Sequence, residues 1–442
     1  MNVKSSSIVR SYLVLTGLYT LSASLIWGVN TLFLLEAGLS ISQVFFANAI
    51  FTAAMALFEI PTGVLADTRG RRVSFLLSIA ILFIGTLGYV AAARIGGGLW
   101  LFGLMSIILG LGYTFYSGAM EAWLVDALNA TGFKGELDSI FARGSAVSAG
   151  AMLIGSVSGG ILGTVSLALP FLIRAGLLVI VFVVALITMH EIGFTPSKSS
   201  VSELPAEMRK IARASVQYGW KQRSMRLLII TSFIQSLFFA WGFYAWQPYF
   251  LDLLGRDAPW VAGVIAALVA LATMAGNAFV QWRSHKAGRR TTMMLIAAIV
   301  GTLAAIGVGL VGSFWTAVTF YLISALAMGV WMPVKQAYMH GLIPSAQRAT
   351  VISFDGLVGS AGSVVGQVGL GQLAETRSIA TGYVVGGMLT ALAWPVVLRL
   401  RRRKDPEDYI IGDAGKEGAC GAQGLPSVAC VDSHAGVAVS GD

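Results

Sequence analysis

The sequence predicts an all-α membrane protein in which twelve transmembrane helices form two pseudo-symmetric halves of six. The composition is the first reason: 56% of the 442 residues are hydrophobic and only 12% are charged, whereas a soluble surface needs about a quarter charged residues. The second reason is a series of apolar runs that reach the roughly 20 residues needed to cross a bilayer. The third is a set of short motifs that recur in the same order in both halves of the chain.

The apolar runs place the spanning helices. The first run is too long for a cleavable signal peptide, so we interpret it as the first span. Several runs exceed the minimum length, which allows the helices to tilt. The expected spans lie near residues 11–35, 41–66, 73–93, 98–128, 138–165, 167–190, 226–254, 259–283, 291–312, 314–343, 348–375 and 378–400.

Basic residues predict the orientation of these helices. Lys and Arg concentrate in the segments that share a side with both termini, and only Arg94, Arg174, Arg256 and Arg377 fall on the other side. Cytoplasmic loops carry such an excess, so we expect a multi-pass protein of the cell (inner) membrane with both termini in the cytoplasm. The net charge of +9 is therefore a topology signal, and nucleic-acid binding is not expected.

Polar stretches divide the chain into four parts. We expect an N-terminal six-helix half over residues 1–190, a cytoplasmic linker over 191–225 and a C-terminal six-helix half over 226–400. Residues 401–442 are expected to form a disordered cytoplasmic tail, because they become rich in Gly, Ala and Ser without helical periodicity. Both cysteines, Cys420 and Cys430, lie in this tail, so neither a disulfide framework nor a metal site is expected.

The two halves resemble repeats of each other. Internal duplication of this kind in a transporter puts a binding site between the halves, near the middle of the membrane. The matching pairs, in order along the chain, are Gly70–Arg72 with Gly288–Arg290, Gly118–Trp123 with Pro333–Tyr338, and Arg143–Gly144 with Asp355–Gly356.

One motif carries a family resemblance. The run Gly63-Val-Leu-Ala-Asp67-Thr-Arg69-Gly70-Arg71-Arg72 stands between the second and third spans and closely resembles the signature of the major facilitator superfamily. A degraded copy runs from Gln281 to Arg290, with His285 at the position of the acid. The resemblance covers residues 11 to 400 and implies a membrane transporter for small molecules.

The chemistry of this motif is consistent with a gate. Gly63 allows close helix packing and Gly70 a tight turn, while Asp67 can accept hydrogen bonds from arginines or from a helix N-terminus. In the family, this cluster latches the two halves when the cytoplasmic side is closed. We expect the opposing helix to be the eleventh, which carries Arg348 and Asp355. The alternative is that the basic turn only fixes the topology.

Charged residues inside or near the spans form a second group of candidates. Glu121 and Asp126 lie in the fourth span, and counting along a straight helix puts Glu121 near the cytoplasmic boundary. We therefore expect Glu121 to join a salt-bridge relay with Arg71, Arg72 and Arg143. The alternative is a proton-coupling role, because intramembrane acids are often functional.

Three further charges belong to the same group. Glu59 in the second span could join this relay. Lys335 in the tenth span lies at a depth similar to that of Glu121, so we expect the two to pair across the halves; the alternative is that Lys335 attracts an anionic substrate. Asp355 in the eleventh span is the second candidate for a coupling carboxylate.

The resemblance implies that spans 1, 4, 7 and 10 line the central cavity. These spans offer mainly aromatic and amide side chains and few fixed charges, which suits flat, lipophilic or cationic molecules. Some of these aromatics are also expected to serve in packing. The candidate cavity residues are Tyr19, Trp27, Asn30, Tyr113, Tyr116, Trp241, Tyr244, Gln247 and Trp331.

These features predict a secondary active transporter, similar to drug:proton antiporters, that exports small hydrophobic compounds by alternating access. One feature weakens this prediction: such antiporters carry G-P-x-x-G-G in the fifth span, and here Ser156 replaces the proline in Gly155-Ser-Val-Ser-Gly159-Gly160. A nutrient or metabolite carrier working by symport or uniport is therefore the alternative, and a non-transporting sensor or scaffold is the alternative from another class.

Enzymatic activity and cofactors are not expected, and the sequence has no GxxxxGK[ST] loop for ATP-driven pumping. The expected partners are the substrate, protons and membrane lipid, and we expect a monomer.

Overall fold

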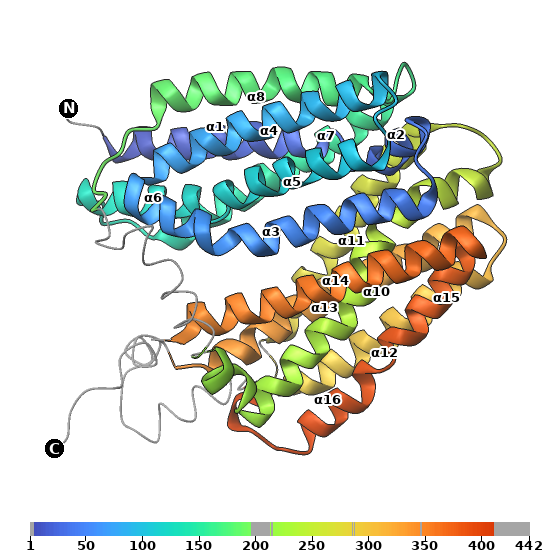
Figure 1. The fold of residues 1–442 in the computed structure, drawn as a ribbon. Coiled ribbons are helices and arrows are strands. Elements are labelled where there is room, and N and C mark those ends of the chain that lie inside the picture. Colours follow the sequence, from blue (N-terminus) through green and yellow to red (C-terminus); the bar gives the residue numbers. More distant parts are fainter. Residues whose placement is uncertain are drawn as a thin grey trace.

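The computed structural model describes residues 4–195, 213, 215–284, 286, 288–344 and 347–410. Long helices lie side by side in two bundles, as the expected two halves require (Figure 1). The N-terminal bundle contains α1 (Ser5–Ser24), α2 (Asn30–Glu36), α3 (Ile41–Arg69), α4 (Arg71–Arg94), α5 (Gly98–Tyr116), α6 (Ala119–Ala130), α7 (Leu137–Gly163) and α8 (Leu169–Thr188).

The C-terminal bundle repeats this arrangement and is followed by a short ordered segment. It contains the π-helix η2 (Ser215–Trp220), α10 (Arg223–Leu254), α11 (Pro259–Ser284), α12 (Arg290–Leu310), α13 (Phe314–Leu342), α14 (Arg348–Thr376), α15 (Ile379–Thr390) and α16 (Ala393–Arg401). After α16 come a 3-10 turn, η4 (Pro406–Asp408), and the strand β2 (Tyr409–Ile410), which pairs antiparallel with β1 (Gly288–Arg289).

Eleven helices of the described chain are long and apolar enough to cross a membrane. The first expected span, 11–35, is not among them; it is divided into α1 and α2 by turns at residues 25–29. The two pieces run one after the other along the N-terminal bundle (Figure 1). The boundaries of the other spans agree with the apolar runs to within a few residues.

Two other helices that the sequence predicts as continuous are interrupted. The span expected over 98–128 is divided into α5 and α6 because Gly118 adopts a φ of 72°, a left-handed conformation that glycine takes without a steric cost. The span expected over 378–400 is divided between α15 and α16 at residues 391–392. An apolar run therefore predicts a crossing but not whether one helix makes it.

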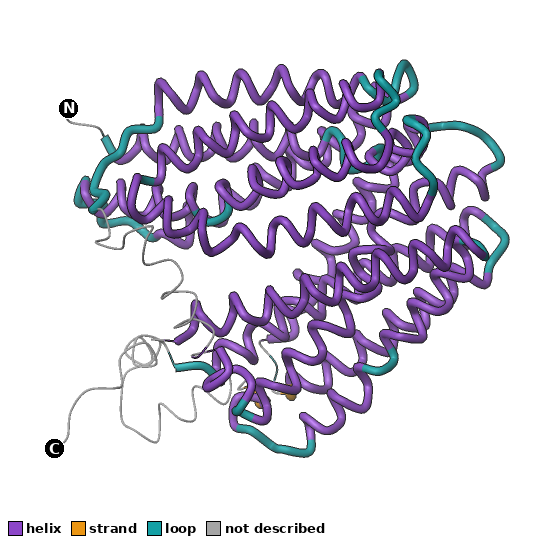
Figure 2. The backbone as a smooth tube through the Cα atoms, in the orientation of Figure 1, coloured by secondary structure: helices purple, strands orange, loops and turns teal. Residues whose placement is uncertain are grey.

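The two bundles are in contact at one end and diverge at the other. They diverge toward the end that carries the ordered N-terminal residues, here called the terminal end, and meet at the opposite, far end (Figures 1 and 2). The contacts between the halves join α3 to α14, α7 to α11 and α2 to α10.

Glycine lets helices of this bundle approach to main-chain contact. A Cβ atom at Gly159 of α7 would collide with the carbonyl oxygen of Leu25, and one at Gly160 would lie 2.7 Å from the Cα of Gly263 in the other half. The glycine-rich run of the fifth span thus serves close packing, as small residues commonly do between membrane helices.

A glycine pair on α7 tests this packing. Gly159→Ala should destabilise the protein by about 1–3 kcal/mol, because overfilling a packed contact forces the backbone apart. Gly150→Ala on the same helix meets nothing within 4 Å and should leave stability unchanged or slightly higher, since alanine favours helix. Thermal unfolding of the two variants in detergent measures the difference, and equal midpoints would contradict the packing argument.

Candidate functional site

A cavity of about 420 Å³ lies where the two halves meet. Most of its wall comes from α10, α11, α12 and α13 of the C-terminal half, while Trp27 and Met152 contribute from the N-terminal half. This location between duplicated halves is where the repeat pattern predicts a transport site.

The wall of this cavity is apolar and aromatic, with a few uncharged polar groups. Phe239, Phe243, Trp246 and Trp331 supply large aromatic surfaces. Among the described residues that line it, none carries a charge. The polar members are Gln235, Thr273, Asn277, Ser324 and Thr390. Such a surface favours an uncharged or lipophilic ligand, with the amides and hydroxyls available to orient it.

Two of the nine expected cavity residues, Trp27 and Trp331, line this cavity. Trp241 does not: its side chain is fully buried and packs against Phe45 and Tyr383, with ring centroids 5.5 and 5.1 Å away. The reason is helix rotation, because the cavity face of α10 carries positions 235, 238, 239, 242, 243 and 246, and successive residues of a helix are turned by about 100°.

The remaining expected residues do not line the cavity. Tyr19 stacks on Tyr116 with ring centroids 3.7 Å apart, and Gln247 is fully buried. Asn30, Tyr113 and Tyr244 are partly buried.

Lys335 forms a buried ion pair within the C-terminal half. Its ammonium nitrogen lies 2.6 Å from Oδ2 of Asp355, and the hydroxyl of Ser232 from α10 contacts both partners, accepting from the lysine and donating to the carboxylate. Lys335 is one helical turn beyond Trp331 of the cavity wall. The expected pairing of Lys335 with Glu121 across the halves is therefore not formed.

Glu121 occupies a different environment from the one expected. It is exposed, in the first turn of α6 just after the Gly118 break, and forms no ion pair with any residue that the structure describes. Arg71 lies 2.6 Å from Asp67 and 3.9 Å from Asp126, so it pairs without Glu121.

The other expected members of the relay are also separate from Glu121. Arg72 donates to the carbonyl of Leu186, while Glu59 and Arg143 are exposed, and neither forms an ion pair within the described residues. Thus Asp67, Arg71 and Asp126 lie together, and the rest of the expected relay is not assembled.

Within the described residues, the signature motif forms no hydrogen bond or ion pair with the opposing half. Asp67 binds Arg71 of the following helix, whereas Asp355 of α14, the expected counterpart, binds Lys335. Arg69 and Arg348 form no ion pair with any described residue. Because the halves diverge at this end, the latch that the resemblance implies would require a different arrangement of the halves (Figure 1).

Two carboxylates that the sequence analysis missed organise the terminal end. Glu191, just beyond α8, accepts hydrogen bonds from the main-chain N–H groups of Arg71 and Arg72 at 3.3 and 2.9 Å. It thereby satisfies two of the free donors at the start of α4. The two carboxylates, Glu191 and Asp408, each follow the last helix of their half. This shared position in the sequence is the signal that could have identified both.

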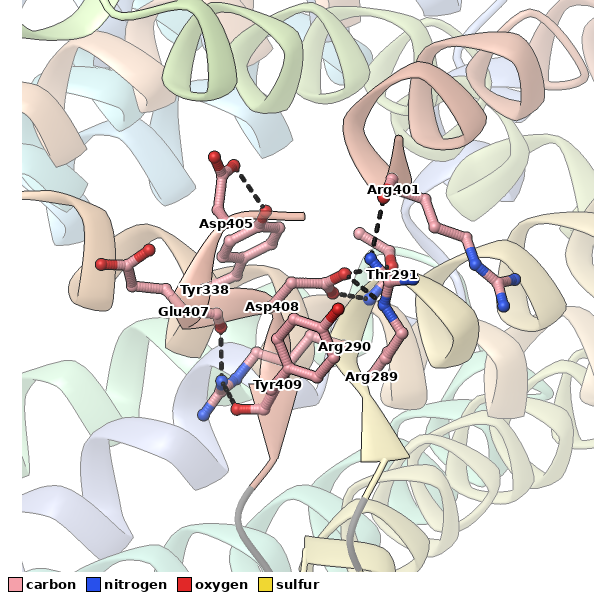
Figure 3. Close-up of polar contacts among 9 residues, drawn as sticks. All are labelled: Arg289, Arg290, Thr291, Tyr338, Arg401, Asp405, Glu407, Asp408 and Tyr409. Carbon is pink, nitrogen blue, oxygen red and sulfur yellow. Dashed lines mark hydrogen bonds and ion pairs between the residues drawn. The ribbon is translucent and has the colours of Figure 1, made fainter. Parts of the chain in front are cut away.

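The counterpart in the other half is Asp408, which lies after α16 and is fully buried. It accepts from the N–H and hydroxyl of Thr291 at 2.7 and 2.8 Å and from Nε of Arg289 at 2.9 Å, as Figure 3 shows. It therefore binds the degraded motif copy. His285, at the acid position of that copy, lies outside the described residues.

This arrangement corrects the expected tail. Residues 401–410 are ordered: they complete α16 and return to pair with β1, and the Tyr338 hydroxyl donates to Asp405 at 3.0 Å (Figure 3). The carboxylates of Asp405 and Asp408 bind this segment to the C-terminal half. Composition alone does not reveal such contacts. Residues 411–442, and most of the expected linker, lie outside the described part of the chain.

Arg174 lies near the start of α8, and its side chain is 1% exposed inside the N-terminal bundle. One guanidinium nitrogen donates to the Tyr113 hydroxyl at 3.4 Å, and no carboxylate within the described residues pairs with it.

The comparisons with known proteins agree with this architecture. The family model of the Major Facilitator Superfamily matches residues 12–366 and 258–426. The chain belongs to the major facilitator superfamily. This membership, with the fold, shows that the protein is a multi-pass membrane transporter and not an enzyme.

Relatives within the superfamily vary in what their names say they carry. An uncharacterised transporter of this type, YxaM from Bacillus subtilis (strain 168), is 22% identical over 89% of this chain and 94% of its own length. A D-xylose transporter from Levilactobacillus brevis is 27% identical, over 30% of this chain and 27% of its own length.

Solved structures share the fold at low identity. The nucleoside transporter NupG superimposes with a TM-score of 0.74 at 12% identity, over 89% of this chain and 99% of its own. A D-xylose-proton symporter gives 0.65 at 14% identity, over 89% and 97%. At these identities the likeness supports the fold alone.

Proposed function

We propose that this superfamily member is a secondary active transporter that works by alternating access and exports small lipophilic compounds in exchange for protons. The observation that carries the proposal is the cavity between the halves, whose described lining is aromatic and apolar and holds no charged side chain. Apolar walls with a few orienting amides bind uncharged or lipophilic molecules well, whereas an exclusively anionic substrate would require a counter-charge.

The terminal end is proposed to face the cytoplasm, because most Lys and Arg residues flank the spans there. The divergence of the halves at this end then corresponds to an inward-facing state, from which a compound could enter the cavity (Figure 2). The reverse state would close this end, and the Asp67 cluster is proposed to latch it by contacting α14.

Proton coupling is proposed to use Asp355 and Lys335. The pair lies one helical turn from the cavity wall at Trp331, and the Asp355 side chain is 15% exposed. Protonation of Asp355 would leave the Lys335 charge uncompensated. Proton binding to Asp355 and the packing of α10, α13 and α14 must therefore affect each other. Glu121, exposed and unpaired within the described chain, is the weaker candidate.

Everted membrane vesicles with an acidified interior test the proposal. Tetraphenylphosphonium, ethidium and uncharged lipophilic compounds should each dissipate the pH gradient, which a fluorescent weak base reports. Trp331→Ala, which removes a cavity wall, should weaken this response, while Glu121→Gln should retain it. A folded protein that responds to none of these compounds would contradict lipophile export.

A nutrient carrier working by symport is the second candidate. Ser156 in place of the antiporter proline favours it, as do the relatives named for D-xylose and nucleosides and the polar groups of the cavity. Uptake of D-xylose or uridine into right-side-out vesicles, driven by inward proton flow and absent from vesicles without the protein, would establish this function instead.

A further inference from the structure

The break between α1 and α2 leaves main-chain polar groups without helical partners. Residues 25–29 form turns, so the Trp27 carbonyl and the Thr31 N–H lie outside a regular hydrogen-bond ladder. Inside a membrane protein such groups must find partners, because an unsatisfied main-chain group away from water costs several kcal/mol.

A single side chain of the other half satisfies both groups. The amide nitrogen of Gln247 donates to the Trp27 carbonyl at 2.8 Å, and its oxygen accepts from the Thr31 N–H at 2.9 Å. Gln247 is fully buried. Because a primary amide presents a donor and an acceptor side by side, it can replace the missing helical bonds.

The helix that carries Gln247 has a matching defect. Pro248 follows it inside α10 and has no N–H, so the carbonyl of Tyr244, four residues earlier, loses its helical partner. The hydroxyl of Thr31 donates to this carbonyl at 3.1 Å. Interrupted hydrogen bonding in one half is thus completed by groups from the other half.

The same break also forms part of the cavity wall. Trp27 lines the cavity, and a Cβ atom at Gly28 would lie 3.2 Å from main-chain atoms of Ala262 and Gly263 in α11. The segment 25–29 therefore contacts the transport site and the far-end junction of the halves together.

We propose that Gln247 is the positioning residue of a far-end gate. By holding the Trp27 carbonyl and the Thr31 N–H, its amide fixes the Trp27 ring at the cavity wall and keeps the far end closed. Opening of the far end separates Gln247 from both groups, and local rearrangement or water must then satisfy them. The inference rests on the proposed alternating access. It adds the contact that determines the ratio of protein with the far end open to protein with the far end closed.

Distances between spin labels measure this balance in the full-length protein. Cys420 and Cys430 are first replaced by serine, and the protein is placed in lipid nanodiscs. One pair of labels at the exposed positions Glu36 and Arg256 reports on the far end, and another pair at Lys134 and Arg402 reports on the terminal end. Double electron–electron resonance gives the populations of long and short distances.

Gln247→Leu should shift these populations in opposite directions at the two ends. Losing two buried hydrogen bonds should raise the ratio of far-end-open to far-end-closed protein about tenfold or more. Thr31→Val, which removes only the bond to the Tyr244 carbonyl, should cause a smaller shift in the same direction.

A third variant separates gating from general damage. In Gln247→Glu the ionised carboxylate cannot donate to the Trp27 carbonyl, whereas the protonated carboxyl regains one donor and one acceptor. The far end should therefore be open at alkaline pH and close again at acidic pH in this variant, with a smaller response in the wild type. A merely structural role would not produce this reversal.

Wild-type distances at both ends in folded Gln247→Leu, together with a pH response of Gln247→Glu no larger than that of the wild type, would overturn the inference. The measurement requires no substrate. Its failure is therefore distinct from failure of the proposed transport activity, which the vesicle assay measures separately.

Discussion

Asp355→Asn is expected to reduce substrate-dependent proton movement in everted vesicles by about tenfold or more. Coupling free energies between linked binding sites commonly correspond to changes of this size. The asparagine keeps the shape of the side chain but cannot take up a proton, and it removes the 2.6 Å ion pair with Lys335. Fluorescence measurement of the pH gradient, with Glu121→Gln as the matched carboxylate control, gives the result.

A double variant distinguishes loss of coupling from loss of stability. Removing one member of a buried ion pair leaves the other uncompensated and can cost about 3–5 kcal/mol, and Lys335 is only 5% exposed. Asp355→Asn with Lys335→Met removes both charges, so stability should recover while proton movement stays low. Normal proton movement in either variant would exclude Asp355 as the coupling carboxylate.

Asp408→Ala is expected to cause the largest loss of stability among the terminal-end variants, about 3 kcal/mol. The substitution leaves the N–H and hydroxyl of Thr291 and the guanidinium of Arg289 without their carboxylate partner. Arg289 is 22% exposed, so water can replace part of the interaction that its guanidinium loses with the carboxylate. The thermal midpoint in detergent should fall by roughly 5–10 °C.

Two controls accompany this prediction. Glu407→Ala should have little effect, because Arg290 binds the main-chain carbonyl of Glu407 and not its carboxylate. A chain ending after Ile410 should keep wild-type stability, whereas one ending after Lys404 should match Asp408→Ala. Equal midpoints for the two truncations would show that the segment contributes nothing to stability.

Sequence reasoning predicted the helices well because each depends on a local property. A run of about 20 apolar residues must cross the bilayer whatever its neighbours are, and the structure places helices close to the expected boundaries. The motif from Gly63 to Arg72 likewise identified the family, which the family model confirms.

The candidate site was predicted only in part. Trp27 and Trp331 line the cavity as expected, but Trp241 is fully buried and packs against Phe45 of the N-terminal half and Tyr383 of the C-terminal half. Periodicity places residues on a common face without saying which neighbour that face meets, so the rotation of α10 could not be inferred. The partner of Lys335 could not be inferred either, because the folded chain brings Asp355 closer to it than Glu121.

The sequence by itself determined that this protein crosses the membrane repeatedly, is built from two related halves and belongs to a transporter superfamily, because hydropathy and motifs reside in contiguous residues. Only the tertiary structure decided where the first span breaks and what completes it, since Gln247 lies 216 residues away from Thr31. It also decided that Asp408 binds the degraded motif copy. Hydrogen bonds between distant segments depend on how the helices are oriented and packed, and no local pattern encodes that arrangement.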